Sequence, residues 1–243
     1  MEPGNYNNPY EYAKTYATKD HLQEAVRSFF LKVYGWMTLG LVLTGVVAYV
    51  VASTPQLAGI FMGSPMFYVL LIGEVGLVLL LSARIGKMSA SMATIMFLLY
   101  AFVNGLTFSV IFVVYEMQSI IQVFFISGGT FGIMSLYGMI TKRDLTSVGS
   151  LAIKGLIGII IASVVNLIFL KSSTFDLVIS MVGVLIFVGL TAYDTWQLKK
   201  VAEANPGAPE DVIHKSAIIG ALRLYLDFIN LMLHLLRLMG NRR

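Results

Sequence analysis

Seven long apolar segments, separated by short polar stretches, fill the chain after about residue 30. An α-helix of about 20 apolar residues crosses the hydrocarbon core of a bilayer, and each segment has roughly that length. The pattern therefore predicts an all-α integral membrane protein, in which residues 31–243 form one bundle of seven transmembrane helices. The expected spans are residues 33–52, 65–83, 91–115, 120–140, 151–170, 175–198 and 218–239.

The first 30 residues differ from the rest of the chain. Residues 1–20 are rich in Asn and Tyr and show no apolar period, which is typical of a flexible arm. Residues 21–32 mix acidic, basic and apolar side chains, so we expect a short surface helix that leads into the first span. The predicted organisation is thus a cytoplasmic arm over residues 1–30 followed by the membrane domain.

The last apolar segment carries a polar stripe. Arg223, Asp227, Asn230, His234 and Arg237 follow one another at steps of four, three, four and three residues. On an α-helix these five side chains fall within an arc of roughly 80°. Ionisable groups inside a membrane usually face the protein interior or a wet cavity, so we expect this helix at the centre of the bundle. The alternative is an amphipathic helix that lies on the membrane surface.

The composition agrees with a membrane protein and excludes several other classes. Hydrophobic residues make up 57% of the chain and charged residues 12%, against about 25% charged in soluble domains. Mean hydropathy is +0.80. The net charge of +4 comes from basic residues near helix ends, so membrane lipid and not nucleic acid is the expected partner. The chain has no cysteine, which excludes disulfides, thiolate metal sites and cysteine nucleophiles.

Lys and Arg alternate between successive loops. They occur in the arm and after the second, fourth and sixth spans, whereas the other loops contain only Lys171. The positive-inside rule therefore predicts a cytoplasmic N-terminus. A seventh full span would export Arg242 and Arg243, against that rule. The last helix either spans regardless, which its apolar length favours, or dips into the membrane and returns.

Two acids and one arginine are predicted at a similar depth. Asp194 lies a little over one turn from the cytoplasmic end of the sixth span, Asp227 two to three turns into the seventh, and Arg84 at the end of the second. Two close carboxylates in a low-dielectric site tend to share a proton. If the arginine pairs with them, protonation releases it, which makes a pH switch. The alternative is a static buried ion network, with Arg223 or Arg84 as a permanent counter-ion.

Further oxygen-bearing side chains lie within the spans. Glu74 near the bilayer centre is either a neutral, hydrogen-bonded acid or part of an acidic lining for a cation path. Carboxylate and amide oxygens are the ligands that calcium prefers. The candidate ligands and path-lining residues are Glu74, Asn104, Asn166, Asp194, Asp227 and Asn230. We expect Asp194 and Asp227 to contact calcium as a transported ion, and we expect no resident cofactor.

Three segments resemble the transmembrane Bax inhibitor motif family. Its two signature segments are similar to TAYDTWQLKK (Thr191–Lys200) and LRLYLDFINLMLHLLRLMGNRR (Leu222–Arg243). Its opening helix is similar to KVYGWMTLGLVLTG (Lys32–Gly45). The resemblance covers nearly the whole chain after about residue 20.

The resemblance implies a seven-helix bundle with the last helix at its centre. Bacterial members are pH-sensitive calcium leak channels of the plasma membrane, with an aspartate pair as sensor and an arginine latch. By motif match the pair corresponds to Asp194 and Asp227. By position the latch corresponds to Arg84, and a glutamate of the second helix to Glu74. Related members bind and restrain a membrane-bound protease.

The sequence therefore predicts a pH-sensitive calcium or other cation leak channel. The alternative is a protein that regulates a membrane protease or another membrane partner without transport. Intramembrane aspartyl proteases also pair two aspartates to activate water. Their second aspartate follows a Gly-x-Gly turn, whereas Asp227 follows Leu224, Tyr225 and Leu226 in an unbroken helical pattern. We therefore do not expect an enzyme.

Overall fold

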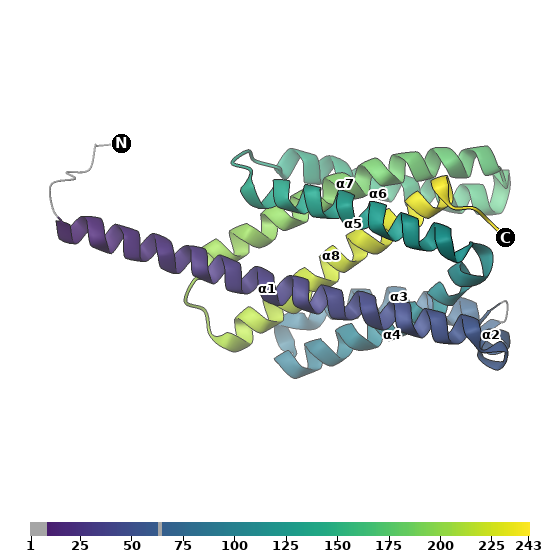
Figure 1. Cartoon of the computed structure of the whole chain (residues 1–243), viewed down its shortest axis with the longest axis horizontal. Coiled ribbons are helices and arrows are strands. Elements are labelled where there is room, and N and C mark those ends of the chain that lie inside the picture. Colours follow the sequence, from purple (N-terminus) through teal and green to yellow (C-terminus); the bar gives the residue numbers. More distant parts are fainter. Residues whose placement is uncertain (1–8, 63–64) are drawn as a thin grey trace.

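The computed structural model describes residues 9–62 and 65–243, and these residues are almost entirely helical (Figure 1). Within the described ranges the only β-type pairing is one isolated bridge, between Tyr115 and Arg242. A 3-10 turn, Ile85–Lys87, follows α3, and a π-helical turn, Asn166–Leu170, extends α6. The helices are α1 Pro9–Ser53, α2 Pro55–Phe61, α3 Pro65–Arg84, α4 Ala90–Val114, α5 Met117–Ile140, α6 Thr146–Val165, α7 Ser173–Ala204 and α8 Glu210–Met239.

Seven of these helices, α1 and α3 to α8, are long and apolar enough to cross a membrane. This confirms the seven-span, all-α prediction for the described part of the chain. Large apolar side chains cover the outside of the bundle; Ile72, Leu151 and Phe169, for example, are 74%, 73% and 76% exposed. Exposed apolar area on this scale needs a hydrocarbon surrounding. The short helix α2 occupies the connection between the first two spans.

Helix α1 is longer than the first predicted span. It begins at Pro9 and continues without a break through residues 21–32, where a separate surface helix was expected. Phe29 and Phe30 in this part are 5% and 4% exposed, and Lys32 forms an ion pair with Glu210 at the start of α8. The first eight residues of the predicted arm lie outside the described residues.

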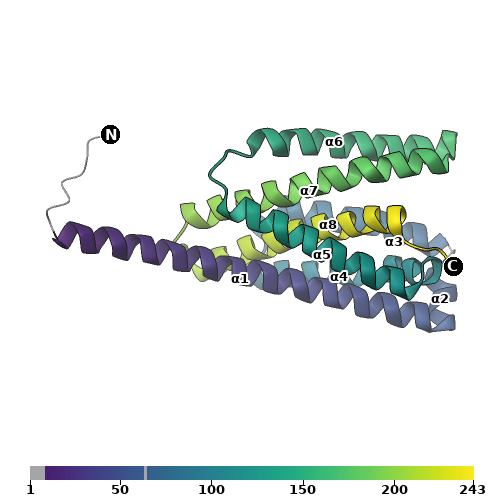
Figure 2. The ribbon, with the colours of Figure 1, turned by 45° about the horizontal axis from the view of Figure 1, so that its top comes forward.

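Helix α8 packs against α1, α4, α5 and α7 (Figure 2). It is the most buried of the seven spans, whereas α3 packs mainly against α4, and α6 mainly against α7. It is one unbroken helix of 30 residues. At about 1.5 Å per residue it is long enough to cross the bilayer completely. Its length and its packing against four helices therefore favour a full span over a re-entrant or a surface helix.

The bundle has two distinct ends (Figure 1). The start of α1, the α5–α6 loop and the α7–α8 loop lie at one end, which we call the amino-terminal end. Helix α2 and the C-terminus lie at the other, the carboxyl-terminal end. The start of α1 and the C-terminus are thus at opposite ends of the bundle, as an odd number of spans requires.

Candidate functional site

A cavity of about 560 Å³ lies between α6, α7 and α8. Helix α6 contributes apolar side chains to it, among them Ile153, Leu156 and Ile160. The polar lining comes from the other two helices. Asp194, Tyr193 and Gln197 belong to α7, and Arg223, Asp227 and Asn230 belong to α8.

The cavity brings the two candidate aspartates together. The side chains of Asp194 and Asp227 both line its wall, and the negative charge of Asp194 acts on the carboxyl group of Asp227. Asp227 is only 4% exposed, whereas Asp194 is half-buried, and the Oδ2 atom of Asp227 has no hydrogen-bond partner among the described residues. Two neighbouring carboxylates in a low-dielectric site repel each other when both are ionised. A shared proton removes that repulsion and satisfies the unpartnered oxygen.

Arg223 is the cation whose charge acts on both aspartates. It lies one turn before Asp227 on α8, which places both side chains on the same face. One guanidinium nitrogen of Arg223 donates a hydrogen bond of 3.2 Å to Oε1 of Gln197. The amide of Gln197 in turn donates to the hydroxyl of Tyr193, one turn earlier on α7. These contacts join α7 and α8 beside the carboxyl pair.

The structure does not bring Arg84 to this cavity. Arg84 is exposed at the end of α3, and α3 packs mainly against α4, away from α7. The predicted latch therefore differs from the arginine found beside the pair. The polar stripe of the last helix already contained Arg223, but the depth of Arg84 in the membrane gave no information about its direction around the bundle.

Glu74 and Asn104 belong to a second polar cluster, which is separate from the cavity. Oε1 of Glu74 accepts a hydrogen bond of 2.6 Å from the hydroxyl of Thr107. Oδ1 of Asn104 accepts one of 3.0 Å from the hydroxyl of Tyr225, which also bonds to Thr44 Oγ1 at 2.7 Å. The cluster connects α1, α3, α4 and α8 through buried side chains. This arrangement matches a hydrogen-bonded acid inside the bundle.

Asn166 has a local role at the carboxyl-terminal end. Its amide nitrogen donates to the Ser172 carbonyl at 3.1 Å and to Asp176 Oδ1 at 2.6 Å. Its own oxygen accepts from the Ser172 amide at 3.0 Å. These bonds hold the turn between α6 and α7. Of the four predicted path residues, only Asn230 lines the cavity of the aspartate pair.

His234 lies on the polar stripe between this cavity and the carboxyl-terminal end. Its ring stacks on Phe187, with the ring centres 5.7 Å apart, and packs directly against Gly183 of α7. It is 7% exposed, and its Nδ1 atom has no hydrogen-bond partner among the described residues. Because Phe187 also lines the cavity, the two rings close the seam between α7 and α8 at this level.

The six predicted oxygen ligands thus occupy three separate places. Across the described residues there is no group of three or more His, Cys, Asp or Glu side chains that could hold a metal ion. The aspartate pair supplies two carboxylates, and Asn230 and Gln197 supply amide groups at the same cavity. Such a lining suits transient contact with a passing cation better than a closed coordination shell.

Comparison with known proteins agrees with this architecture. Residues 26–243 match the family described as inhibitor of apoptosis-promoting Bax1. The inner membrane protein YbhL of Escherichia coli K12 is 46% identical over 219 residues, which cover 90% of this chain and 93% of that protein. A Rickettsia prowazekii protein is 40% identical over 236 residues, covering 96% of this chain and 99% of its own. The chain therefore belongs to the Bax inhibitor family of integral membrane proteins.

Proposed function

We propose that the protein is a pH-sensitive leak channel for calcium or related cations, gated by Asp194 and Asp227. The observation that carries the proposal is the pair of carboxyl groups, which shares a polar cavity with Arg223 where α7 packs against α8. Ionisable groups are expensive within a membrane and mark functional sites there by default. Helix α6 adds only apolar side chains to the wall, so these three groups dominate the local electrostatics.

The proposed switch depends on the charge of the pair. At neutral pH the two carboxyl groups hold one proton between them and keep one negative charge, which attracts Arg223. When the pH falls, a second proton neutralises the pair, and this attraction is lost. The electrostatic attraction that links α7 to α8 is therefore present at pH values above the range in which the pair takes up its second proton. It is absent at pH values below that range. Acidification favours the open arrangement.

The route for the ion follows the polar stripe of α8. Asp227 and Asn230 lie at the cavity, and Arg237 lies near the carboxyl-terminal end. His234, stacked on Phe187, stands between them and keeps the seam closed. Separation of α7 from α8 after the pair loses its charge would move this ring stack aside. The oxygen atoms of the two aspartates and of Asn230 would then replace part of the hydration shell of the cation.

Calcium flux into reconstituted vesicles, measured against pH, tests this mechanism. Flux through the wild type is expected to rise on mild acidification. Asp194→Asn and Asp227→Asn each remove one member of the pair, so the pH response is expected to flatten in both. Asp144→Asn is the matched control, because Asp144 is an exposed carboxylate in the α5–α6 loop. An unchanged pH response in both pair variants would overturn the proposal.

A second candidate function is regulation of a membrane partner without transport. The observation that favours it is the outer face of α5, where a Cβ added at Gly128, Gly129 or Gly132 would meet no atom within 4 Å. Small residues allow another membrane helix to approach closely. Co-purification of a membrane protease, lost on Gly129→Leu, together with no ion flux at any pH, would select this function over the first.

A further inference from the structure

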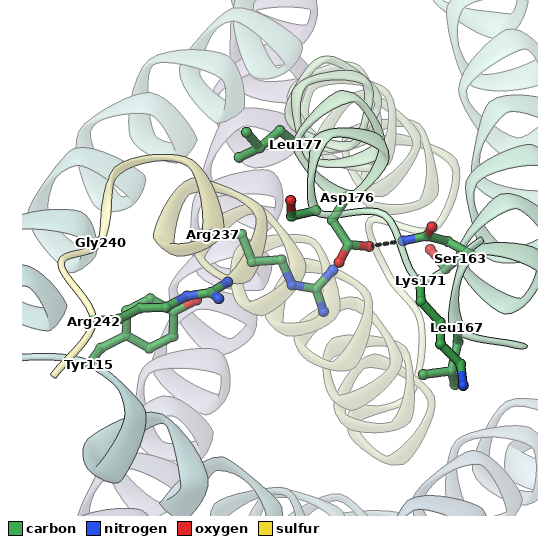
Figure 3. Close-up of a pocket in the computed structure, with 11 residues that line it drawn as sticks. Tyr115, Ser163, Leu167, Lys171, Asp176, Leu177, Arg237, Gly240 and Arg242 are labelled. Carbon is green, nitrogen blue, oxygen red and sulfur yellow. Dashed lines mark hydrogen bonds between the residues drawn. The ribbon is translucent and has the colours of Figure 1, made fainter. Parts of the chain in front are cut away.

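A second cavity, of about 790 Å³, lies at the carboxyl-terminal end of the bundle (Figure 3). Its wall combines the end of α6, the start of α7, the last turn of α8 and the C-terminal segment after it. Three cationic side chains line it, Lys171, Arg237 and Arg242, and the acid beside them is Asp176. Neither the aspartate pair nor the Glu74 cluster contributes to this cavity.

Lys171 is held at the cavity by an unusual backbone conformation. It is the one non-glycine residue in the described ranges with a positive φ, 48°, and its amide donates to the Asn166 carbonyl at 2.7 Å. A left-handed conformation is unfavourable for a non-glycine residue, so it persists only where the surroundings enforce it. Here the side-chain bonds of Asn166 to Ser172 and Asp176 enforce it. The turn thereby fixes the backbone position of Lys171 at the edge of the cavity.

Arg242 is held in place by the chain around it. The Asn241 carbonyl accepts a hydrogen bond of 3.0 Å from the Glu116 amide, and the Arg243 amide donates one of 3.0 Å to the Val114 carbonyl. These bonds attach the C-terminal segment to the junction of α4 and α5. The guanidinium of Arg242 lies over the ring of Tyr115, 5.9 Å from its centre. A cation on an aromatic face keeps its charge available to an anion.

The positive charge of this cavity is not balanced by protein acids. Within the described part of the chain, none of the three cations forms an ion pair. Asp176 already accepts a hydrogen bond of 2.6 Å from Asn166, although the side chain of Arg237 extends toward it (Figure 3). The start of α7 brings a positive helix-dipole end to this cavity, whereas the ends of α6 and α8 bring negative ones, so the charged side chains decide the sign of its charge. The cavity therefore has an excess of positive charge.

We propose that this cavity binds a phosphate group, either in the headgroup of an acidic phospholipid or as free phosphate. Guanidinium groups form paired hydrogen bonds with phosphate oxygens, and two of the three cations are arginines. The neighbouring lining residues Leu167 and Leu177 are 75% and 43% exposed, so lipid tails can lie directly beside the cavity. The proposal concerns a site apart from the aspartate pair and does not depend on the leak-channel function.

Calorimetric titration of the detergent-solubilised full chain tests the site. The three probes are short-chain phosphatidylglycerol, short-chain phosphatidylcholine and inorganic phosphate. We expect Lys171→Gln and Arg237→Gln each to weaken binding of the anionic probe about fivefold, since a basic residue near an anionic lipid contributes about that factor. Arg237→Lys keeps the positive charge but lacks the planar guanidinium group, so its affinity should lie between those of Arg237→Gln and the wild type. Asp176→Asn should strengthen binding while its amide oxygen still accepts from Asn166.

Arg243→Gln is the matched control, because it removes the same charge one residue from Arg242 at a position that does not line the cavity. Binding of phosphatidylglycerol alone identifies a headgroup site, and competition between phosphatidylglycerol and inorganic phosphate identifies a site for the phosphate group itself. Both results support the proposal. Equal binding of phosphatidylcholine, no binding of any probe, or equal effects of Arg243→Gln and Arg237→Gln would overturn it.

Discussion

Arg223 and Arg84 illustrate what a single residue position in a membrane helix does and does not reveal. Both side chains were expected near the aspartate pair, because depth in the bilayer can be estimated from sequence position. Depth does not give the direction that a side chain faces around the bundle. That direction depends on which helices pack together, and α3 packs against α4 while α8 packs against α7. Arg223 therefore shares the cavity with the pair and Arg84 does not.

This difference predicts that only one of two arginine variants changes the calcium leak. Arg223→Gln removes the cation that the ionised pair attracts, so calcium leak at neutral pH should rise and its pH response should flatten. Arg223 is itself exposed, and ion pairs with an exposed partner contribute at most about 1 kcal/mol, so the rise should not exceed about fivefold. Arg84→Gln should leave the flux unchanged. The assay is the vesicle flux measurement. A flattened pH response in Arg84→Gln alone would show that Arg84, and not Arg223, is the latch.

A residue-scale prediction also follows from the buried acid. Thr107→Val removes the hydroxyl that donates to Glu74 and keeps the shape of the side chain. A buried polar group that loses its partner costs about 1–3 kcal/mol, so the variant should unfold at a lower denaturant concentration in detergent micelles. Thr107→Ser retains the donor and is the control. Equal destabilisation by both variants would indicate that packing, and not the hydrogen bond, holds Glu74.

At the scale of helices, a glycine of α7, Gly183, permits close packing of α7 on α8. A Cβ at Gly183 would lie 2.5 Å from Nε2 of His234, and the stack with Phe187 restrains that ring. A Cβ at Gly189 on the same helix would make ordinary contacts, 3.6 Å from Val148. Gly183 therefore permits the close approach that buries His234.

We accordingly expect Gly183→Ala to destabilise the protein and Gly189→Ala not to destabilise it. Overpacking at Gly183 should lower the free energy of unfolding by about 1–3 kcal/mol. The gain in helix propensity at Gly189 should leave stability unchanged or raise it by up to about 1 kcal/mol. Unfolding in detergent, followed by circular dichroism, measures both variants. Equal stability of the two proteins would contradict the role assigned to Gly183.

The existence of all seven spans was predictable here, and so were several of their ends, whereas the starts of α1, α6 and α8 were not. Apolar length indicated all seven spans, because the bilayer sets a minimum length for each. Hydropathy does not indicate how far a helix continues beyond the membrane, because residues there can be polar. Residues 10–34 contain neither Gly nor Pro, so no residue in this segment interrupts a helix. Phe29 and Phe30 are buried and attach the end of this segment to the bundle. Helix α1 therefore extends through a segment whose polar composition had indicated an arm and a separate helix.

At the scale of the whole molecule, the two ends differ in where their basic residues lie. At the amino-terminal end they are spread over several helices and loops, for example Lys199 and Lys200 of α7 and Lys142 and Arg143 between α5 and α6. At the carboxyl-terminal end Lys171, Arg237 and Arg242 converge on one cavity. A phosphate bound there would compensate these charges. The full span of α8 would then be compatible with a cytoplasmic N-terminus, although it places basic residues on the outer side.

This proposed orientation can be measured because the chain contains no cysteine. Single-cysteine variants Arg143→Cys and Glu116→Cys place one thiol at each end of the bundle, both at exposed positions. With the N-terminus in the cytoplasm, a membrane-impermeant maleimide should label Glu116→Cys on intact bacterial cells, and Arg143→Cys only after permeabilisation. The wild type, which should not react, is the control. The reverse labelling pattern would place the phosphate cavity on the cytoplasmic side. The orientation would then contradict the positive-inside rule as applied to the loops.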